Sequence, residues 1–242
     1  MEKGTKGAFG RRGFLRAAAL LSLLSWLPSP VRAFFIDRLY VRTVEKDTFR
    51  FDPETGNIRW TNRKVVEPYL LTVEGLVEQP LRLSYADLTS FVRASQVSDF
   101  HCVEGWSVAK VQWAGFRFQE IVKRARPKPG AAYAVFHALG ETADKPRGQD
   151  HYIESHPVRE LLDPAKECLL TLFMGGKPLP HDHGAPLRLI APYSLGYKNI
   201  KYIHRIEFAR EPRPGWWTLA NSAYPVIAPV PADRLRKKER KK

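Results

Sequence analysis

Hydrophobic residues fall into short runs along most of the chain, and these runs predict strands more often than helices. Residues 131–138 and 168–174 are hydrophobic runs bounded by Pro or Gly, which is typical of buried strands. Residues 92–103 predict a strand that delivers Cys102 near its end. The predicted strands are residues 69–75, 92–103, 131–138, 168–174, 187–191 and 203–208, with short extended pieces over 76–83.

Helix signals are fewer and shorter. Ser84 is a good N-cap and predicts a short helix that reaches Phe91. Residues 119–124 predict a second helix, stopped by the prolines that follow, and residues 157–162 a third, with a proline in its first turn. Residues 52–57 predict a turn between two short extended pieces. The excess of strands, in hairpin order, predicts an α+β fold with mixed sheets and short helices.

The first 33 residues are expected to lie outside the fold. Arg11 and Arg12 are followed by Phe-Leu and another basic residue, residues 17–27 are hydrophobic, and Ala33 ends a small-residue cleavage site. The hydrophobic run is shorter than the ~20 residues that a membrane-spanning helix needs. This order predicts a signal peptide over 1–33. The paired arginine indicates twin-arginine export of a folded protein to the periplasm.

The formal net charge of +14 is concentrated in part at the C-terminal end. Residues 213–242 are Pro-rich and then basic, which predicts an extended tail lying on the domain. Neither zinc-finger spacing nor a basic helix with heptads accompanies the charge, so nucleic-acid binding is not expected. The charge suits a membrane surface or an acidic electron-transfer partner. The remaining boundaries predict an N-terminal extension over 34–64 and the main domain over 65–212.

Cys102 is the first candidate for chemistry, because it stands between His101 and Glu104 and precedes Trp106. Such a cysteine could be a nucleophile, a soft metal ligand, half of a disulfide or a buried hydrophobic residue. Export favours a disulfide between the two cysteines, whereas folding in the reducing cytoplasm favours thiols. Cys168 lies in a hydrophobic run and is expected to pack in the core.

A second candidate block follows residue 180. His181 and His183 form an H-x-H pair, which without a third ligand is a weak sign of a zinc site. Arg188, Lys198 and Lys201, with glycines that let backbone amides approach, suit a bound phosphate better. His151 and His156, which precede this block, are expected to be ordinary surface histidines.

Five ordered segments together resemble a known family. They are Cys102–Ser107, Trp113–Phe116, Gly176–Pro180, His183–Arg188 and Gly196–Lys201. Over roughly residues 65–210 they resemble the molybdopterin-binding domain of the sulfite oxidase superfamily. The Cys-Val-Glu-Gly-Trp form is most similar to the bacterial periplasmic branch, which includes the methionine-sulfoxide reductase catalytic subunit.

The resemblance implies a sulfite-oxidase-type molybdopterin-binding fold over 65–212 and one molybdenum–molybdopterin cofactor per chain. It makes Cys102 the molybdenum ligand and Glu104 a catalytic residue that could relay protons. The cofactor-binding residues that it implies are Cys102, His183, Arg188, Lys198, Asn199, Ile200 and Lys201. A polar cofactor contact of relatives falls at His137 or Ala138, so it stays unassigned.

The resemblance also implies two-electron oxygen-atom transfer. Ser107 stands where sulfite oxidases carry an arginine, so a small S- or N-oxide is favoured over sulfite. The chain has no Cys-x-x-Cys-His haem motif, which favours a separate electron partner, expected to be a membrane haem protein. A monomeric catalytic subunit is expected. The alternatives are a sulfite-oxidising enzyme or an exported binding module that keeps the fold without turnover.

Overall fold

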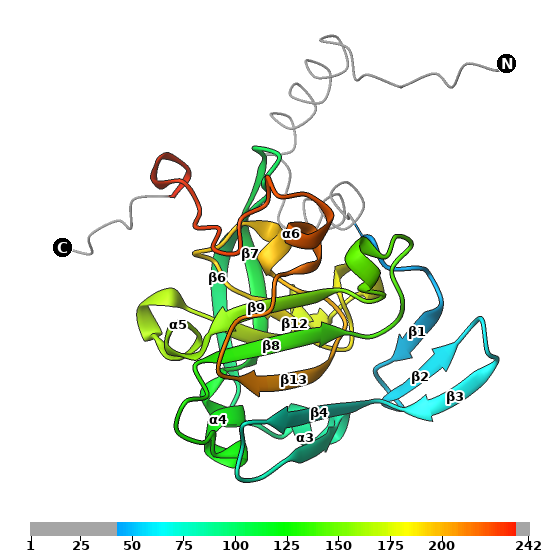
Figure 1. Cartoon of the computed structure of the whole chain (residues 1–242). Helices are drawn as coiled ribbons and strands as arrows, with labels where there is room; N and C mark the ends of the chain where they lie inside the picture. The colour runs from blue at the N-terminus through cyan, green and yellow to red at the C-terminus, as the bar shows by residue number, and fades with distance from the viewer. Residues whose placement is uncertain (1–42, 236–242) are drawn as a thin grey trace, which may run out of the picture. The chain divides into compact units, whose positions relative to one another are not determined.

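The computed structural model describes residues 43–235, which form three β-sheets with short helices between the strands (Figure 1). The signal peptide predicted over residues 1–33 lies outside the described residues, and so do residues 236–242 of the basic tail. Within residues 43–235, no helix has the length and hydrophobicity needed to cross a membrane.

The first sheet is a small antiparallel unit of three strands, β1 (Phe49–Asp52), β2 (Asn57–Trp60) and β3 (Val65–Pro68). The turn between β1 and β2 is the one that the sequence predicted. Asp52 stabilises it, because its carboxylate accepts hydrogen bonds from the Glu54 N–H at 3.0 Å and the Thr55 hydroxyl at 2.9 Å. Part of the predicted N-terminal extension therefore forms a sheet, and it contributes Phe49, Ile58 and Trp60 to the core.

The second sheet carries the Cys102 segment. Its strands are β6 (Ala94–His101), β7 (Ser107–Phe116), β10 (Leu169–Met174), β11 (Lys177–Pro178) and β12 (Arg188–Ile190). They run in the order β11-β10-β7-β6, with β12 also paired to β10, and every pairing is antiparallel. The long β6–β7 hairpin turns at Cys102, which agrees with the prediction that a strand ends near this residue. β7 itself was not predicted as a strand.

The third sheet joins distant parts of the chain. It contains β4 (Leu70–Gly75), β5 (Leu81–Ser84), β8 (Tyr133–Ala138), β9 (Ile153–Pro157) and β13 (Ile203–Ala209), in the order β5-β4-β13-β8-β9. β13 pairs parallel with β4 and antiparallel with β8, so the sheet is mixed, as predicted. The Tyr69 hydroxyl donates to the Ile203 carbonyl at 2.6 Å and reinforces the junction.

In the described part of the chain, three short α-helices lie between strands, α3 (Tyr85–Thr89), α4 (Gln119–Ala125) and α5 (Val158–Leu162), and a fourth, α6 (Trp216–Ala220), follows β13. The predicted N-cap of α3 is confirmed, since Ser84 and Asp87 form a capping box. The helices predicted at 119–124 and 157–162 are confirmed as α4 and α5. The 3₁₀ turns are η1 (Pro146–Gly148), η2 (Pro164–Lys166), η3 (His181–His183), η4 (Gly196–Lys198) and η5 (Ala232–Arg234).

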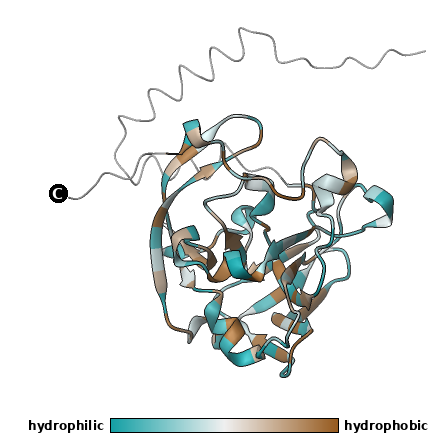
Figure 2. Ribbon diagram, turned by 60° about the vertical axis from the view of Figure 1, so that its left-hand side comes forward, coloured by the Kyte–Doolittle hydropathy of each residue, from teal (hydrophilic) through white to brown (hydrophobic). Residues whose placement is uncertain are grey.

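The main core is aromatic and aliphatic and is shared by the sheets and α4. Phe116, Phe118, Phe136 and Phe208 are its largest fully buried members together with several leucines. A smaller cluster around Trp113 and Leu169 packs against β12. Figure 2 shows hydrophobic and hydrophilic residues alternating along the strands, which is the pattern expected where a sheet has one face on the core.

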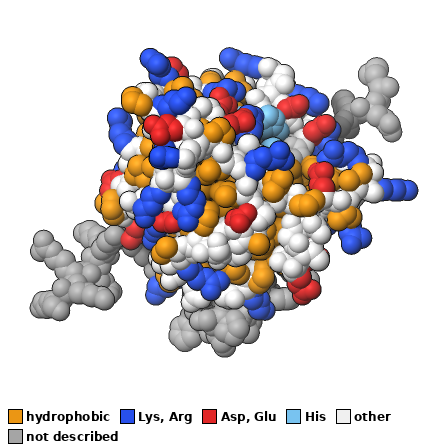
Figure 3. Space-filling model, turned by 90° about the horizontal axis from the view of Figure 1, so that it is seen from below, with side chains coloured by type: hydrophobic (Ala, Val, Ile, Leu, Met, Phe, Trp, Pro, Cys, Tyr) orange, Lys and Arg blue, Asp and Glu red, His pale blue; other side chains and the backbone are white. Residues whose placement is uncertain are grey.

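Two expectations are corrected by the described structure. The predicted extended tail begins with α6, where Trp216 is buried and its indole N–H donates to the Thr142 hydroxyl at 3.1 Å. His156, expected at the surface, is buried, and its Nε2 is 2.9 Å from the Lys198 carbonyl. The face in Figure 3 carries Lys and Arg side chains scattered among acidic and hydrophobic ones rather than one continuous basic patch.

Candidate functional site

Cys102 lies in the turn that joins β6 to β7. Its N–H donates to the Trp106 carbonyl at 2.9 Å, and the Gly105 N–H donates to the Cys102 carbonyl at 3.2 Å. Gly105 has φ of +95°, a conformation that only glycine adopts without strain. The turn leaves Cys102 half-buried, and no disulfide joins it to Cys168. The disulfide alternative is therefore excluded, and the nucleophile and ligand alternatives stay open.

Glu104 shares this turn. Its Oε2 lies 3.9 Å from the Cys102 Sγ and accepts a hydrogen bond from the Trp106 indole N–H at 3.3 Å. The side chain is exposed, so a carboxylate that reaches the thiol also reaches solvent. This geometry is what a group that carries protons between solvent and Cys102 requires.

His101 and Ser107 are the last residue of β6 and the first of β7, and they face each other across the turn. The buried His101 has Nδ1 at 2.7 Å from the Ser107 hydroxyl. Arg234 of η5 approaches the same turn, with hydrogen bonds to Cys102, Trp106 and Ser107. Sequence reasoning missed Arg234, because a basic residue in a Pro-rich segment is typical of a solvated tail.

Arg188 is the most informative buried charge. It lies on β12, is 6% exposed and donates to the His183 carbonyl at 3.1 Å. Its Nε is buried without a hydrogen-bond partner, and within residues 43–235 it forms no ion pair with a carboxylate. Burial lowers the pKa of Arg188 to about 10, so the guanidinium remains charged at neutral pH. A buried cation of this kind has a strong demand for an anion.

Lys201 is a second cation in the same region. Burial lowers its pKa to about 8, and the charge of Arg188 acts in the same direction. Its Nζ is 3.3 Å from the Asp182 carbonyl. Gly184 has φ of +108°, and a Cβ there would lie only 2.7 Å from the Lys201 Cβ, so glycine is needed for this approach. Two cations that repel each other in a buried region would both be stabilised by one phosphate.

The backbone ties these cations together. The Leu189 N–H donates to the Ile200 carbonyl at 3.0 Å, and the Tyr202 N–H donates to the Gly184 carbonyl at 3.0 Å. His183, in η3, is buried next to them and provides the carbonyl that Arg188 binds. The structure therefore brings together His183, Arg188, Ile200 and Lys201, which are four of the residues that the resemblance implied for cofactor binding.

The side chains of Lys198 and Asn199, which the resemblance also implied as cofactor-binding residues, have partners within the protein. Lys198 is buried and forms an ion pair with Glu154, and it also donates to the Ser155 carbonyl at 3.2 Å. Burial raises the pKa of Glu154 to about 7, against the attraction of Lys198. The Asn199 amide accepts from the Ala191 N–H at 2.6 Å and so holds its own loop. Both side chains stabilise the segment internally instead of reaching toward Arg188.

Phe100 connects the turn to the cations. Its ring centroid lies 5.1 Å from the guanidinium carbon of Arg188. Gly196, at the start of η4, packs on the same ring so closely that a Cβ would lie 2.6 Å from the Phe100 Cζ. The residue two positions before Cys102 thus touches both the Arg188 side chain and the loop that leads to Lys201.

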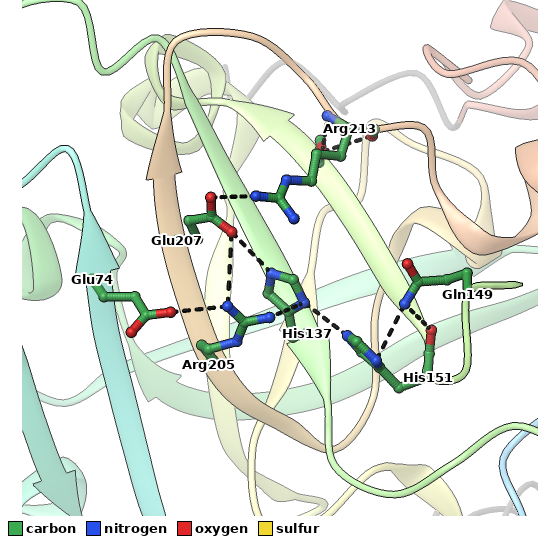
Figure 4. A network of polar contacts seen from close by, with 8 residues as sticks. Glu74, His137, Gln149, His151, Arg205, Glu207 and Arg213 are labelled. Carbon is green, nitrogen blue, oxygen red and sulfur yellow. Dashed lines mark hydrogen bonds and ion pairs between the residues drawn. The ribbon is translucent and has the colours of Figure 1, made fainter.

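A separate polar network joins residues of β4, β8 and β13 to the loop before β9 (Figure 4). His137 has Nδ1 at 2.9 Å from the His151 Nε2 and 2.8 Å from a nitrogen of Arg205, and Glu207 lies on its other side at 3.5 Å. Burial lowers the pKa of His137 to about 2, so this histidine is neutral. His137 is therefore engaged with Arg205 and Glu207, and the implied polar cofactor contact remains unassigned.

Comparison with known proteins identifies the family. Residues 58–217 match the family model described as an oxidoreductase molybdopterin binding domain. The chain belongs to this family. The fold is similar to the sulfane dehydrogenase SoxCD from Paracoccus pantotrophus, with a TM-score of 0.51, 20% identity and coverage of 77% of this chain. The match spans 54% of the SoxCD chain, just over half its length.

The residues of this molybdopterin-binding domain fit the cofactor that the family implies. The pterin phosphate would supply an anion next to the buried Arg188, whose Nε has no hydrogen-bond partner, and near Lys201. Cys102 would supply a soft thiolate donor from an adjacent turn. Within residues 43–235, no three His, Cys, Asp or Glu side chains cluster in a way that would hold a metal ion. The fit thus rests on one sulfur ligand and a phosphate site. Residues 58–217 therefore carry an oxidoreductase-type molybdopterin-binding domain.

Proposed function

We propose that this protein is an exported catalytic subunit that transfers an oxygen atom to or from a small S-oxide or N-oxide. The observation that carries the proposal is the position of the Cys102 turn beside a buried arginine, Arg188, that forms no ion pair within residues 43–235. Arg188 contacts Phe100, which lies two residues before Cys102, and Lys201 adds a second cation. A thiolate donor and a phosphate site at this spacing suit one molybdenum–molybdopterin cofactor.

When bound, the cofactor supplies the two-electron redox centre and exchanges the oxygen atom. In the reductive direction, the S–O or N–O bond of the substrate breaks, two electrons enter from a partner, and two protons convert the oxygen to water. Glu104 is placed to carry those protons, since its carboxylate is exposed and lies 3.9 Å from the Cys102 Sγ. The chain itself binds, orients and supplies protons.

Export and an external electron donor complete the proposal. The paired arginine and short hydrophobic run of residues 11–27 support twin-arginine export to the periplasm. The sequence has no haem-attachment motif, which supports a separate partner, and a membrane haem protein is the proposed one. The net charge of +14 favours fast docking to an acidic surface.

The first test is the metal content of the full-length protein. Wild-type protein from molybdenum-replete cells is expected to carry about one molybdenum and one pterin per chain, measured by mass spectrometry of the metal and by pterin fluorescence. Cys102→Ser is expected to lose activity while unfolding at the same temperature, because the thiol is not part of the core. If wild-type protein contains no molybdenum, the enzyme proposal fails, and a binding module that keeps the fold without turnover is the function that remains.

The second test concerns the substrate. S-oxides and N-oxides with a reduced viologen dye are expected to give turnover, and Glu104→Gln is expected to lower kcat most at high pH, where protons are scarce. A second candidate, oxidation of sulfite, is favoured by Arg234, which brings a guanidinium to within 3.1 Å of the Ser107 hydroxyl. Turnover of sulfite with ferricyanide, without turnover of any oxide, would reverse the assignment.

A further inference from the structure

The segment 225–235 packs along the loop that leads to the phosphate site. The Leu195 N–H donates to the Ala228 carbonyl and the Val230 N–H to the Tyr193 carbonyl, both at 2.9 Å. The Tyr197 hydroxyl donates to the Pro225 carbonyl at 2.7 Å. Ala228 and Val230 are themselves buried. These bonds are backbone pairings with buried side chains, which a solvated tail would not form.

The end of the same segment binds the Cys102 turn. One Arg234 nitrogen donates to the Cys102 carbonyl at 2.9 Å, and the other donates to the Trp106 carbonyl at 2.7 Å. The second nitrogen also donates to the Ser107 hydroxyl at 3.1 Å. The guanidinium therefore spans the two ends of the turn. Its planar fork suits two separate acceptors, which a lysine ammonium at a single point does not.

Arg234 also reaches the hydroxyl that links Ser107 to His101. A guanidinium only donates, so the Ser107 oxygen accepts from Arg234 at 3.1 Å, and the same hydroxyl lies 2.7 Å from the His101 Nδ1. The residue directly before Cys102 is thus oriented through Ser107 by a residue near the end of the chain.

We propose that Arg234 is a positioning residue for the metal-ligand turn, and that segment 225–235 connects this turn to the phosphate-binding loop. The turn has two backbone hydrogen bonds of its own, from Cys102 and Gly105, and Arg234 adds three contacts from outside. The role of Cys102 as metal ligand rests on the proposed function. The restraint on the turn by Arg234 does not, because it can be measured without the metal.

The test uses the reactivity of Cys102 in the full-length chain, produced in molybdenum-depleted cells. Cys168 is buried and its pKa is raised to about 12, so iodoacetamide at pH 8 reports on Cys102 alone. Arg234→Ala is expected to raise the alkylation rate about tenfold, since a freed turn exposes the thiol. Arg234→Lys is expected to give an intermediate rate, because an ammonium keeps the charge but holds one carbonyl.

The matched control is Arg159→Ala, which removes an equal charge from an exposed side chain on α5 that forms no ion pair within residues 43–235. Its alkylation rate is expected to stay within twofold of wild type. Equal rates in wild type and Arg234→Ala would overturn the proposal, as would an equal rise in Arg159→Ala. If Arg234→Ala unfolds at a lower temperature than wild type, Arg234→Lys becomes the deciding variant. A wild-type alkylation rate of Cys102 in Arg234→Lys would then overturn the proposal.

The loaded enzyme provides the second measurement. Arg234→Ala is expected to lower kcat about tenfold with KM within twofold of wild type, because the turn acts through the metal ligand and not through substrate binding. A rise in KM at constant kcat would refute the positioning role. The absence of molybdenum from wild-type protein would defeat the proposed function but leave the alkylation result unaffected, so the two failures are distinguishable.

Discussion

Arg188→Met tests whether the phosphate site is maintained at a cost to the stability of the protein without its cofactor. Arg188 is 6% exposed, has one hydrogen bond to the His183 carbonyl and forms no ion pair within residues 43–235. The difference between its usual pKa of 12.5 and the value of about 10 in the protein corresponds to an unfavourable burial of about 3 kcal/mol. Because the pKa is lowered in the folded state, this cost is present at every pH below about 10.

Favourable contacts offset part of this cost. The hydrogen bond contributes about 1 kcal/mol, and the contacts with the Phe100 and Trp113 rings contribute about 0.5–1 kcal/mol between them. Methionine keeps the hydrophobic part of the side chain and packs well against aromatic rings. We therefore expect Arg188→Met to raise the free energy of unfolding of the cofactor-free protein by about 1–2 kcal/mol.

Urea unfolding of the cofactor-free chain, followed by tryptophan fluorescence, measures this change, and metal analysis measures the cofactor. The stabilised variant is expected to contain little or no molybdenum. The control is Arg117→Met, since Arg117 donates to the Gln96 amide at 2.7 Å and the Cys168 carbonyl at 2.9 Å. That change is expected to lower stability by about 1–3 kcal/mol. Destabilisation by Arg188→Met, or a wild-type cofactor content, would refute the reasoning.

Three further predictions follow from buried groups. The pKa of Lys201 is lowered to about 8, so its charge is lost above that pH. Sulfate binding to the cofactor-free protein, measured by calorimetry, should therefore weaken above pH 8. In Lys201→Arg, which stays charged, it should not weaken. Lys198→Met leaves Glu154 buried without its cation and should lower the free energy of unfolding, measured in urea, by about 3–5 kcal/mol. The double variant with Glu154→Gln should recover part of this stability. An unchanged stability of Lys198→Met would contradict the buried ion pair. A disulfide reagent at pH 8 should react quickly with one thiol, that of Cys102, and with a second only after denaturation. The reason is that burial raises the pKa of Cys168 to about 12. Two thiols that react quickly would show that Cys168 is exposed.

Local signals predicted the elements near the site well. The sequence predicted a strand over residues 92–103 that brings Cys102 near its end, and β6 does end at His101. The α3 helix was visible because Ser84 caps it. The position of Cys102 in a turn at the end of a sheet, close to the basic block, could therefore be predicted from the sequence.

The misjudged residues depend on tertiary contacts. Lys198 reads as a phosphate ligand in sequence, but its partner Glu154 lies 44 positions away, and no local pattern announces that ion pair. The basic and Pro-rich composition around Arg234 predicts a solvated tail, yet its acceptors in the Cys102 turn are up to 132 positions away. Composition describes the average behaviour of such a segment, whereas a few long-range hydrogen bonds decide its actual place.

The parallel pairing of β4 with β13 has a consequence for how the protein is made. The Tyr69 hydroxyl and the Ile203 carbonyl are 134 positions apart, so the third sheet has a high contact order and folds slowly compared with a hairpin. A ribosome-bound chain cannot complete this sheet until β13 has emerged, and Arg234 emerges later still. Synthesis at about 5–20 residues per second leaves the nascent chain without its central strand for several seconds. During that interval the proposed cofactor site is unfinished, so we expect loading to follow the emergence of β13 and Arg234.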